Sequence, residues 1–431
     1  MSLQPLIDDA LAETPPGRVV WVALSGGLDS SLLLTLAAAA CRKHPRPLHA
    51  LHVHHGLQDA ADEFAAHSRR LCSRLGVPLF VEHVAVDTAG GQGLEGAARE
   101  ARYTAFARRV APGETLWLAQ HRDDQAETFL LAALRGSGVR GLAAMPAGRD
   151  WQARRLARPL LGEPRAALEA EARRHGLSWV DDPSNADERL DRNFLRHRVL
   201  PLLGTRWPHA THTLARSAAW AAEADDLLDE LAGQDLARLG DDPARLDVAE
   251  LFTLSRPRQR LLVRHACARL GLALPPSARL EALLDQLAGR RDAEVQVAWP
   301  GGEARVWRDA LYLLTPRAPL PPDWQAEWNG TASVDTPLGR VAVRLWRQDG
   351  GPARLRLAPR TGGERLRFGE RGSRDLKRLL QELGVPPWER ARLLVVWHGE
   401  TTVAVLAPAR GAWLAVGEGW RAAPAVNPGS G

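Results

Sequence analysis

The stretch RVVWVALSGGLDS, residues 18–30, joins a short apolar run to a glycine turn and the start of a helix-like segment. The β-rich composition of residues 18–24 predicts a strand, and Asp29 to Cys41 has the length and composition of a helix. Glycines at such a junction let the backbone approach a phosphate closely, and the free amides of a helix start attract the anion. The sequence therefore predicts a nucleotide-phosphate loop, whose residues are Ser25, Gly26, Gly27, Leu28, Asp29 and Ser30.

The same alternation of strand and helix continues along the N-terminal part of the chain. It predicts βαβ crossovers and an α/β domain with a doubly wound, mostly parallel sheet and helices on both faces. In such a sheet, ligands bind at the carboxyl ends of the strands. The further expected strands are 48–54, 79–86 and 115–120, and the helices are about 59–75, 94–110 and 123–135.

At 431 residues the chain is too long for one ordinary domain. After the α/β sheet we expect a small helical domain and a β-rich α+β C-terminal domain. Residues 151–203 are charged and look irregular apart from a helix at 163–175, and 294–315 alternates like a hairpin around Pro300. The expected parts are a catalytic domain (1–205), a connecting helix (206–240), a helical middle domain (241–316), a Pro-rich linker (317–324) and a C-terminal domain (325–424) with a helix at 373–384.

Composition narrows the class of protein. Three scattered cysteines form neither a disulfide framework nor a Cys-x-x-Cys pair, which indicates a reducing compartment. The first residues lack a basic segment followed by an apolar one, and no apolar run reaches the roughly 20 residues of a membrane span. We therefore expect a cytoplasmic protein without a membrane partner. Only two of the 56 cations are lysine, a skew that genome composition explains.

The loop is not of the Walker A type, because GxxxxGK[ST] and its lysine are absent. An aspartate inside a phosphate loop would repel the phosphates unless it held a divalent cation, so Asp29 is a candidate Mg²⁺ ligand beside a triphosphate. A plain glycine turn, capped by Asp29 and Ser30, is the structural alternative.

A second candidate site follows the fourth expected strand, in HRDDQAET, residues 121–128. Asp124 and Glu127 are three positions apart, so both carboxylates lie on one face of a helix's first turn and can bind an ammonium. The alternative is that these acids only complement the helix dipole. The position of this helix at the strand ends that also carry the phosphate loop favours ligand binding.

The SGGLDS loop resembles the signature of the ATP pyrophosphatase superfamily, which splits ATP between the α- and β-phosphates. Five further segments resemble the tRNA(Ile)-lysidine synthetase family within it. The resemblance covers the first 200 residues and returns near the C-terminus. The segments are LHVHHGL (51–57), EGAAREARYTAF (95–106), HRDDQAET with RGSG (121–138), DDPSN through DRNFLRHRVLP (181–201), and RLRFGERGSRDLKRLLQELGVPPWER (365–390).

The resemblance implies ATP-dependent conversion of the wobble cytidine to lysidine in the CAU anticodon of a minor isoleucine tRNA. The cytosine carbonyl oxygen attacks the α-phosphate, and the ε-amine of free L-lysine then displaces AMP. ATP, Mg²⁺, L-lysine and that tRNA are the implied ligands, and dimers occur in the family. The loop would bind the triphosphate with Mg²⁺ on Asp29, and Val53 would lie beside the adenosine.

The resemblance also implies roles for charged residues. Arg99 or Arg102 would stabilise the charge developing at the α-phosphorus. Arg196 or Arg198 would contact the triphosphate or the tRNA backbone. The family's lysine-binding residues match His121, Asp124 and Glu127.

The C-terminal half carries the excess positive charge, with 27 cations against 17 acids over residues 251–431. Nine cations and three acids fall between Arg354 and Arg378, a basic stripe suited to an RNA backbone, although a solvated Arg-rich surface is the competing interpretation. The candidate tRNA-binding residues are Arg365, Arg367, Arg371, Arg374, Lys377 and Arg378.

Other functions have less support in the sequence. A tRNA thiolase of the same superfamily would usually need paired cysteines, and an amidotransferase synthetase would need a glutaminase nucleophile. A non-catalytic tRNA-binding protein would not need an intact SGGLDS. A zinc site at His54 and His55 lacks a completing Cys or carboxylate cluster.

Overall fold

The computed structural model describes residues 2–56, 60–86, 93–289, 295–368 and 372–423. The chain forms two compact units, Met1–Leu231 and Ala232–Gly431, and the boundary between them falls inside helix α10 (Ala210–Arg238). No helix in these ranges combines the length and the apolar character that a bilayer crossing requires.

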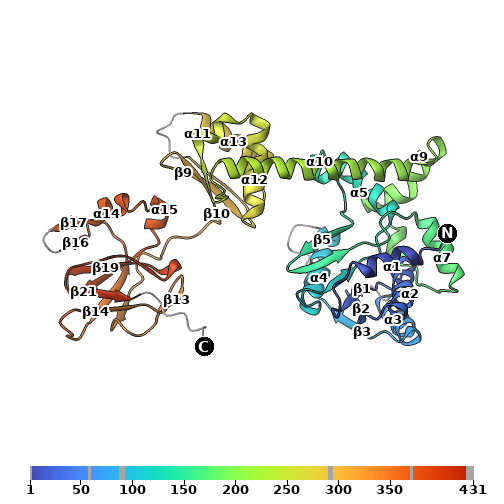
Figure 1. Cartoon of the computed structure of the whole chain (residues 1–431), viewed down its shortest axis with the longest axis horizontal. Helices are drawn as coiled ribbons and strands as arrows, with labels where there is room; N and C mark the ends of the chain where they lie inside the picture. The colour runs from blue at the N-terminus through green and yellow to red at the C-terminus, as the bar shows by residue number, and fades with distance from the viewer. Residues whose placement is uncertain (1, 57–59, 87–92, 290–294, 369–371, 424–431) are drawn as a thin grey trace. The chain divides into compact units, whose positions relative to one another are not determined.

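The first unit is built on a six-stranded sheet with the order β3-β2-β1-β4-β6-β5, in which only β5 runs antiparallel to its neighbour (Figure 1). Its strands are β1 (Val20–Ala23), β2 (Leu48–His54), β3 (Leu79–His83), β4 (Thr115–Trp117), β5 (Gly148–Trp151) and β6 (Arg154–Ala157). Its first helices are α1 (Gln4–Ala12), α2 (Leu28–Lys43), α3 (Ala60–Leu75), α4 (Gly93–Arg109), α5 (Arg122–Leu134), α6 (Val139–Leu142) and α7 (Arg165–Arg174). The predicted doubly wound parallel architecture is confirmed.

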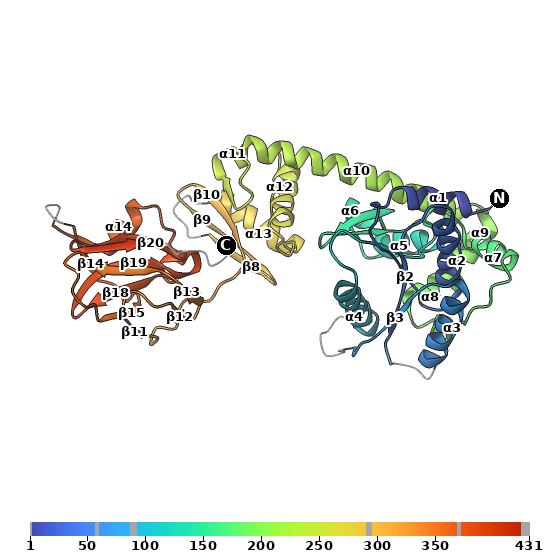
Figure 2. The same ribbon diagram turned by 60° about the horizontal axis from the view of Figure 1, so that its bottom comes forward.

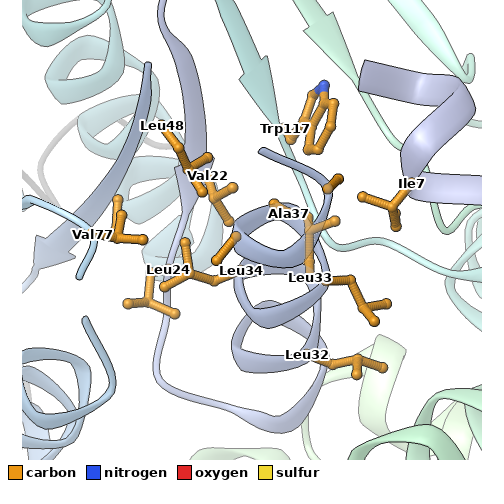
Figure 3. Close-up of a cluster of buried hydrophobic side chains, with 14 of the residues drawn as sticks. Ile7, Val22, Leu24, Leu32, Leu33, Leu34, Ala37, Leu48, Val77 and Trp117 are labelled. Carbon is orange, nitrogen blue, oxygen red and sulfur yellow. The ribbon is translucent and has the colours of Figure 1, made fainter. Parts of the chain in front are cut away.

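Both faces of this sheet are buried, as crossover helices on the two sides require. Strand side chains alternate, so Val20 and Val22 pack with α1, α2 and α7, whereas Trp21 packs with α4 residues on the other face. Figure 3 shows the first of these cores, with Val22 beside Leu34 of α2. Strands β2 and β3 lie between α4 on one side and α2 and α3 on the other (Figure 2).

The expectation of irregular chain over 151–203 is wrong at its start. Residues 148–157 form the β5–β6 hairpin, which extends the sheet beyond β4. Four of the eight strand residues are charged, so the apolar alternation of a buried strand is missing. Of the two strands, β5 forms the edge of the sheet, where charged side chains are typical. The helix expected at 163–175 is present as α7. The remaining elements are η2 (Pro183–Ala186), α8 (Asp191–Phe194), the π-helical turn η3 (Leu195–Val199) and α9 (Leu200–Arg206).

The second unit begins with an antiparallel sheet of order β7-β10-β9-β8, which packs with the C-terminal end of α10 and with three further helices. The predicted hairpin is confirmed, because β8 pairs with β9 around Pro300 and Gly301. The middle region is thus a mixture of helix and sheet. Its elements are β7 (Arg245–Asp247), α11 (Val248–Thr253), α12 (Arg256–Arg269), α13 (Ser277–Ala288), β8 (Gln296–Trp299), β9 (Gly302–Trp307) and β10 (Ala310–Leu314).

The rest of this unit is β-rich, as expected. A sheet of order β11-β15-β18-β19-β16-β17, with β20 on β19, is accompanied by the ribbons β12-β13 and β14-β21. The strands are β11 (Ala326–Trp328), β12 (Val334–Thr336), β13 (Gly339–Val341), β14 (Arg344–Arg347), β15 (Leu355–Pro359), β16 (Arg365–Arg367), β17 (Ser373–Asp375), β18 (Leu394–His398), β19 (Thr401–Ala407), β20 (Ala412–Val416) and β21 (Trp420–Ala423). The helices are α14 (Leu376–Glu382) and α15 (Pro387–Arg390).

The helix expected at 373–384 begins three residues later than predicted. Residues 373–375 pair with β16 instead, and the Asp375 side chain accepts a hydrogen bond from the Arg378 amide as the N-cap of α14. An N-cap residue has non-helical backbone angles, so Asp375 ends the strand and starts the helix.

Candidate active site

The phosphate loop has the shape that its glycines permit. Gly26 has φ +93°, and a Cβ there would lie 3.0 Å from Phe64 Cδ1. The Ser25 and Ser30 hydroxyls are 3.0 Å apart, and Val180 N–H donates to the Gly26 carbonyl at 3.2 Å. Gly27 is the N-cap of α2 and offers no capping side chain, so the first-turn amides of α2 are available to an anion.

A cavity of about 580 Å³ opens at the carboxyl ends of β1, β2 and β4. Its size suits a nucleotide-sized ligand, and its place is the ligand site of a doubly wound sheet. It brings together most of the predicted residues. Its lining includes Ser25, Gly27, Leu28, Asp29, Ser30, Val53, Arg102, Asp124 and Arg196.

The structure distinguishes the two candidate arginines of α4. Arg102 lines the cavity, whereas Arg99 is absent from the described lining and places its guanidinium over the Tyr103 ring, 5.0 Å from the centroid. Burial and the nearby Arg102 charge lower the pKa of His55, another lining residue, to about 4. The cavity wall at His55 is therefore uncharged at neutral pH.

Asp29 presents a carboxylate that the protein leaves partly unpaired. Its Oδ1 atom is buried and has no hydrogen-bond partner, and its Oδ2 atom is 3.7 Å from His121 Nε2. Burial raises the pKa of Asp29, and the His121 and Arg165 charges oppose that rise only in part. The described residues contain no group of three His, Cys, Asp or Glu side chains placed to hold a metal. Asp29 thus suits a cation that takes its other ligands from phosphate and water.

His121 contacts the carboxylates of Asp29, Asp123 and Asp124 but does not belong to the described cavity lining. It is the N-cap of α5, and its backbone N–H donates to Asp124 Oδ2 at 3.0 Å. Its Nε2 atom is 3.4 Å from Asp124 and its Nδ1 atom is 3.6 Å from Asp123. Burial alone lowers the pKa of His121, but the carboxylates of Asp123, Asp124 and Asp29 outweigh it and raise the pKa overall. His121 therefore orients and balances the two acids that face the ligand space.

Asp124 and Glu127 lie together, and two arginines of the 181–201 segment cover them. Arg196 donates from Nε to Glu127 Oε1 at 2.6 Å and from Nη2 to Asp124 Oδ1 at 2.9 Å. Arg192 donates from Nε to Glu127 Oε2 at 2.7 Å and from Nη2 to Asp124 Oδ1 at 3.1 Å. Arg196 pairs with these acids and also lines the cavity, whereas Arg198 pairs with Glu188. The expectation that Arg196 or Arg198 contacts the triphosphate or the tRNA backbone stays a prediction.

The lining residues that the sequence did not assign to the site include two arginines, Arg192 and Arg165. Arg192 precedes Arg196 by four positions, a spacing that places both on one helix face, and this signal was available in DRNFLRHR. Arg165 also lines the cavity, and its backbone N–H donates to Asp123 Oδ2 at 2.9 Å. Nothing local marks Arg165, because it reaches the site through the packing of α7.

None of the three cysteines is a reactive group of this cavity. Cys72 and Cys267 are buried, and burial raises the pKa of each thiol to about 12. Burial also raises the pKa of Cys41. A thiolate nucleophile or persulfide carrier needs a lowered pKa and access to substrate, so the cysteines do not support a sulfur-transfer site.

The candidate RNA-binding cations of the second unit lie on β16, β17 and α14, and acids accompany several of them. Arg367 pairs with Glu418 at 3.2 Å, and Glu382 pairs with both Arg374 and Arg378. Arg367 and Arg378 remain 74% and 81% exposed, so a polyanion can reach both. Arg365 and Lys377 are also exposed, and Arg371 lies outside the described residues.

Three protein-family models match this chain in order. They are the PP-loop domain over residues 3–203, the TilS substrate binding domain over 246–312 and the TilS substrate C-terminal domain over 355–413. Among solved structures, a U34-tRNA thiolase from Methanococcus maripaludis resembles 51% of this chain and 78% of its own, at 16% identity and a TM-score of 0.42.

Curated relatives resemble almost the whole chain. A tRNA(Ile)-lysidine synthase of Xanthomonas axonopodis pv. citri is 47% identical over 437 residues, covering 97% of each chain. A tRNA(Ile)-lysidine synthase of Alkalilimnicola ehrlichii is 46% identical, covering 92% of this chain and 91% of its own. One from Serratia proteamaculans is 43% identical, covering 90% and 91%.

Proposed function

The chain belongs to the tRNA(Ile)-lysidine synthase family, and we propose how its cavity carries out the reaction. It is a ligase that forms a carbon–nitrogen bond, uses ATP through its PP-loop domain and acts on tRNA to make lysidine.

The phosphate loop binds the triphosphate of ATP in this proposal. The backbone amides at Gly27 and Ser30 and the start of α2 receive the β- and γ-phosphates, and Val53 lies beside the nucleoside. The unpaired Oδ1 atom of Asp29 supports this residue as the protein ligand of Mg²⁺. When bound, Mg²⁺ would neutralise phosphate charge and orient the leaving pyrophosphate.

In the first step, the carbonyl oxygen at C2 of the wobble cytidine attacks the α-phosphorus. The bond from that phosphorus to the bridging oxygen breaks, pyrophosphate leaves, and the base is adenylated. Arg102 and Arg165 line the cavity and can stabilise the negative charge that develops on the α-phosphoryl oxygens. Arg102 is the better supported of the two α4 candidates, because Arg99 stacks on Tyr103.

In the second step, the ε-amine of L-lysine attacks C2 and AMP leaves with the former carbonyl oxygen. The amine must lose its proton before it attacks. Asp124 and Glu127 bind an ammonium of lysine, and His121 holds Asp124 in place from behind. Glu127 is fully buried, so a cation that reaches it is largely removed from water and is held strongly.

The remaining chain would hold the tRNA with the CAU anticodon. We propose that residues 1–205 form the catalytic domain, 206–240 the connecting helix, 241–316 the middle domain and 325–424 the C-terminal tRNA-binding domain. The order of the three matching family models supports this division. The exposed cations Arg365, Arg367, Lys377 and Arg378 would contact the phosphate backbone.

One observation carries this assignment: Asp124, which shares its arginine partners with Glu127, lines the same cavity as the phosphate loop. Separate measurement of the two steps tests it. Asp29→Ala should abolish the tRNA-dependent release of pyrophosphate, which reports adenylation. Glu127→Gln should retain pyrophosphate release while losing incorporation of radiolabelled lysine into tRNA.

Glu169→Gln is the matched control, because Glu169 pairs with Arg173 on the surface of α7 and does not line the cavity. It should leave both steps as in the wild type. If Glu127→Gln loses both steps to the same degree, Glu127 does not act in the lysine step alone and the assignment is wrong.

A further inference from the structure

The acids assigned to lysine already accept hydrogen bonds from two cationic side chains. Three of the four carboxylate oxygens of Asp124 and Glu127 accept guanidinium N–H groups of Arg192 and Arg196, and the fourth, Asp124 Oδ2, accepts the His121 backbone N–H. Two negative charges thus face two positive ones. No carboxylate oxygen is left without a donor for an incoming ammonium.

Lysine therefore cannot simply add to this cluster. A third cation beside Arg192 and Arg196 would meet like charges at close range in a site where Glu127 is fully buried. An ammonium must instead replace guanidinium donors, so that the two acids keep their partners and no buried charge is left unpaired. The arginine that leaves must itself find an anion or water.

Arg192 is the guanidinium placed to leave. It makes two of the five arginine hydrogen bonds to the acids and is 29% exposed, whereas Arg196 makes three and is 22% exposed. Its neighbour Asn193 is buried and donates to the Ser184 and Asp187 carbonyls at 2.8 and 3.0 Å. The backbone of α8 is thus anchored, and the exchange needs only a swing of the Arg192 side chain.

ATP bound in the cavity would supply an anion for the displaced Arg192 side chain. Arg192 lines the same cavity as the phosphate loop at Ser25 to Ser30. A bound triphosphate brings several negative charges into that space, and guanidinium groups bind phosphate oxygens strongly. ATP would therefore stabilise the arrangement in which Arg192 has left Asp124 and Glu127.

We propose that Arg192 occupies the ammonium position of the lysine site until substrate arrives, and that its exchange from the two acids to the ATP phosphates makes lysine binding depend on nucleotide. This inference rests on the proposed assignment of lysine to Asp124 and Glu127. Arg192 acts as a positioning residue, because it works through the two acids. By reciprocity, lysine strengthens ATP binding by the same factor.

Equilibrium dialysis of radiolabelled L-lysine against the full chain tests the exchange, with and without α,β-methylene ATP and Mg²⁺. The wild type should bind lysine about tenfold more tightly with the analogue, a typical size of coupling between two sites. Arg192→Gln should bind lysine tightly in both conditions, since its competitor is gone. Arg192→Lys should restore nucleotide dependence, because it returns a tethered cation.

Arg189→Gln is the matched control, because Arg189 is 90% exposed and pairs with Asp187. It should behave as the wild type. The proposal is overturned if nucleotide leaves the wild-type affinity unchanged, if the wild type binds no lysine in either condition, or if Arg192→Gln weakens lysine binding. Should Arg192→Gln fail to fold, as thermal melting would show, loss of nucleotide dependence in Arg192→Lys would contradict the proposal instead.

Glu127→Gln separates this inference from the proposed function. Unchanged lysine binding by Glu127→Gln would mean that Asp124 and Glu127 do not bind lysine, which would contradict both the proposed function and the exchange of Arg192. In a different outcome, Glu127→Gln loses lysine binding while Arg192→Gln shows no higher affinity for lysine without nucleotide than the wild type. That pair of results would support the lysine assignment and refute the exchange of Arg192 alone.

Discussion

The backbone of the phosphate loop can be tested by placing a methyl group at Gly26. An L-residue with positive φ costs roughly 1–2 kcal/mol, and Gly26 has φ +93°. The new Cβ would also lie 3.0 Å from Phe64 Cδ1 and 3.3 Å from the Phe64 carbonyl oxygen, and the backbone oxygen cannot move aside as a ring can. Adding about 1 kcal/mol for this overpacking, we expect Gly26→Ala to lower the free energy of unfolding by about 2–3 kcal/mol.

Gly27→Ala is the matched control one residue along the loop. Gly27 has φ −78°, and the nearest atom to its Cβ would be Ser25 Oγ at 3.6 Å. We expect a change within about 0.5 kcal/mol. Urea unfolding followed by tryptophan fluorescence measures both variants, and the KM for ATP should rise in Gly26→Ala as the loop backbone shifts. Equal stability of the two variants would refute the steric reasoning.

Two more substitutions test the site and the core. Burial raises the pKa of Asp29 in the folded chain, so the ionised carboxylate destabilises the fold at a pH above that pKa. This destabilisation decreases as the pH falls through the folded-state pKa and the carboxyl group takes up a proton. Asp29→Asn should therefore raise the melting temperature at pH 7, with a smaller gain at pH 4, and a lower melting temperature at pH 7 would contradict this sign. Leu33→Ala removes a fully buried side chain of α2 and should cost about 2–5 kcal/mol in urea unfolding. Leu227→Ala, at a side chain 67% exposed, should change the free energy of unfolding by less than about 0.5 kcal/mol. Similar losses of unfolding free energy in the two leucine variants would contradict the placement of Leu33 in the core.

The sequence predicted those parts of the fold whose signals are local. The strands β1 to β4 coincide with apolar runs, and Ser25 to Gly27 form the turn into α2 that the glycines indicate. The β5–β6 hairpin was missed because charged residues hide its alternation. The start of α14 was misplaced because the pairing of β17 with β16 depends on residues distant in sequence.

The sequence predicts which residues belong to the site better than it predicts which of them pair with one another. Helix spacing placed Asp124 and Glu127 on one face, and the structure places both beside the cavity. No local pattern in the sequence predicts that Arg192 and Arg196, which are 65 or more positions away along the chain, pair with these acids. The same limit applies to the choice between Arg99 and Arg102, which depends on how α4 packs against the sheet.

Label transfer measures whether this cavity joins lysine to the wobble cytidine of a tRNA. The full chain is incubated with ATP, Mg²⁺, radiolabelled L-lysine and a folded isoleucine tRNA transcript with the CAU anticodon, beside the same transcript with the wobble cytidine changed to uridine. We expect one lysine per CAU transcript, with equal release of AMP and pyrophosphate, and no label in the uridine transcript. No label in the CAU transcript, or equal label in both, would contradict it.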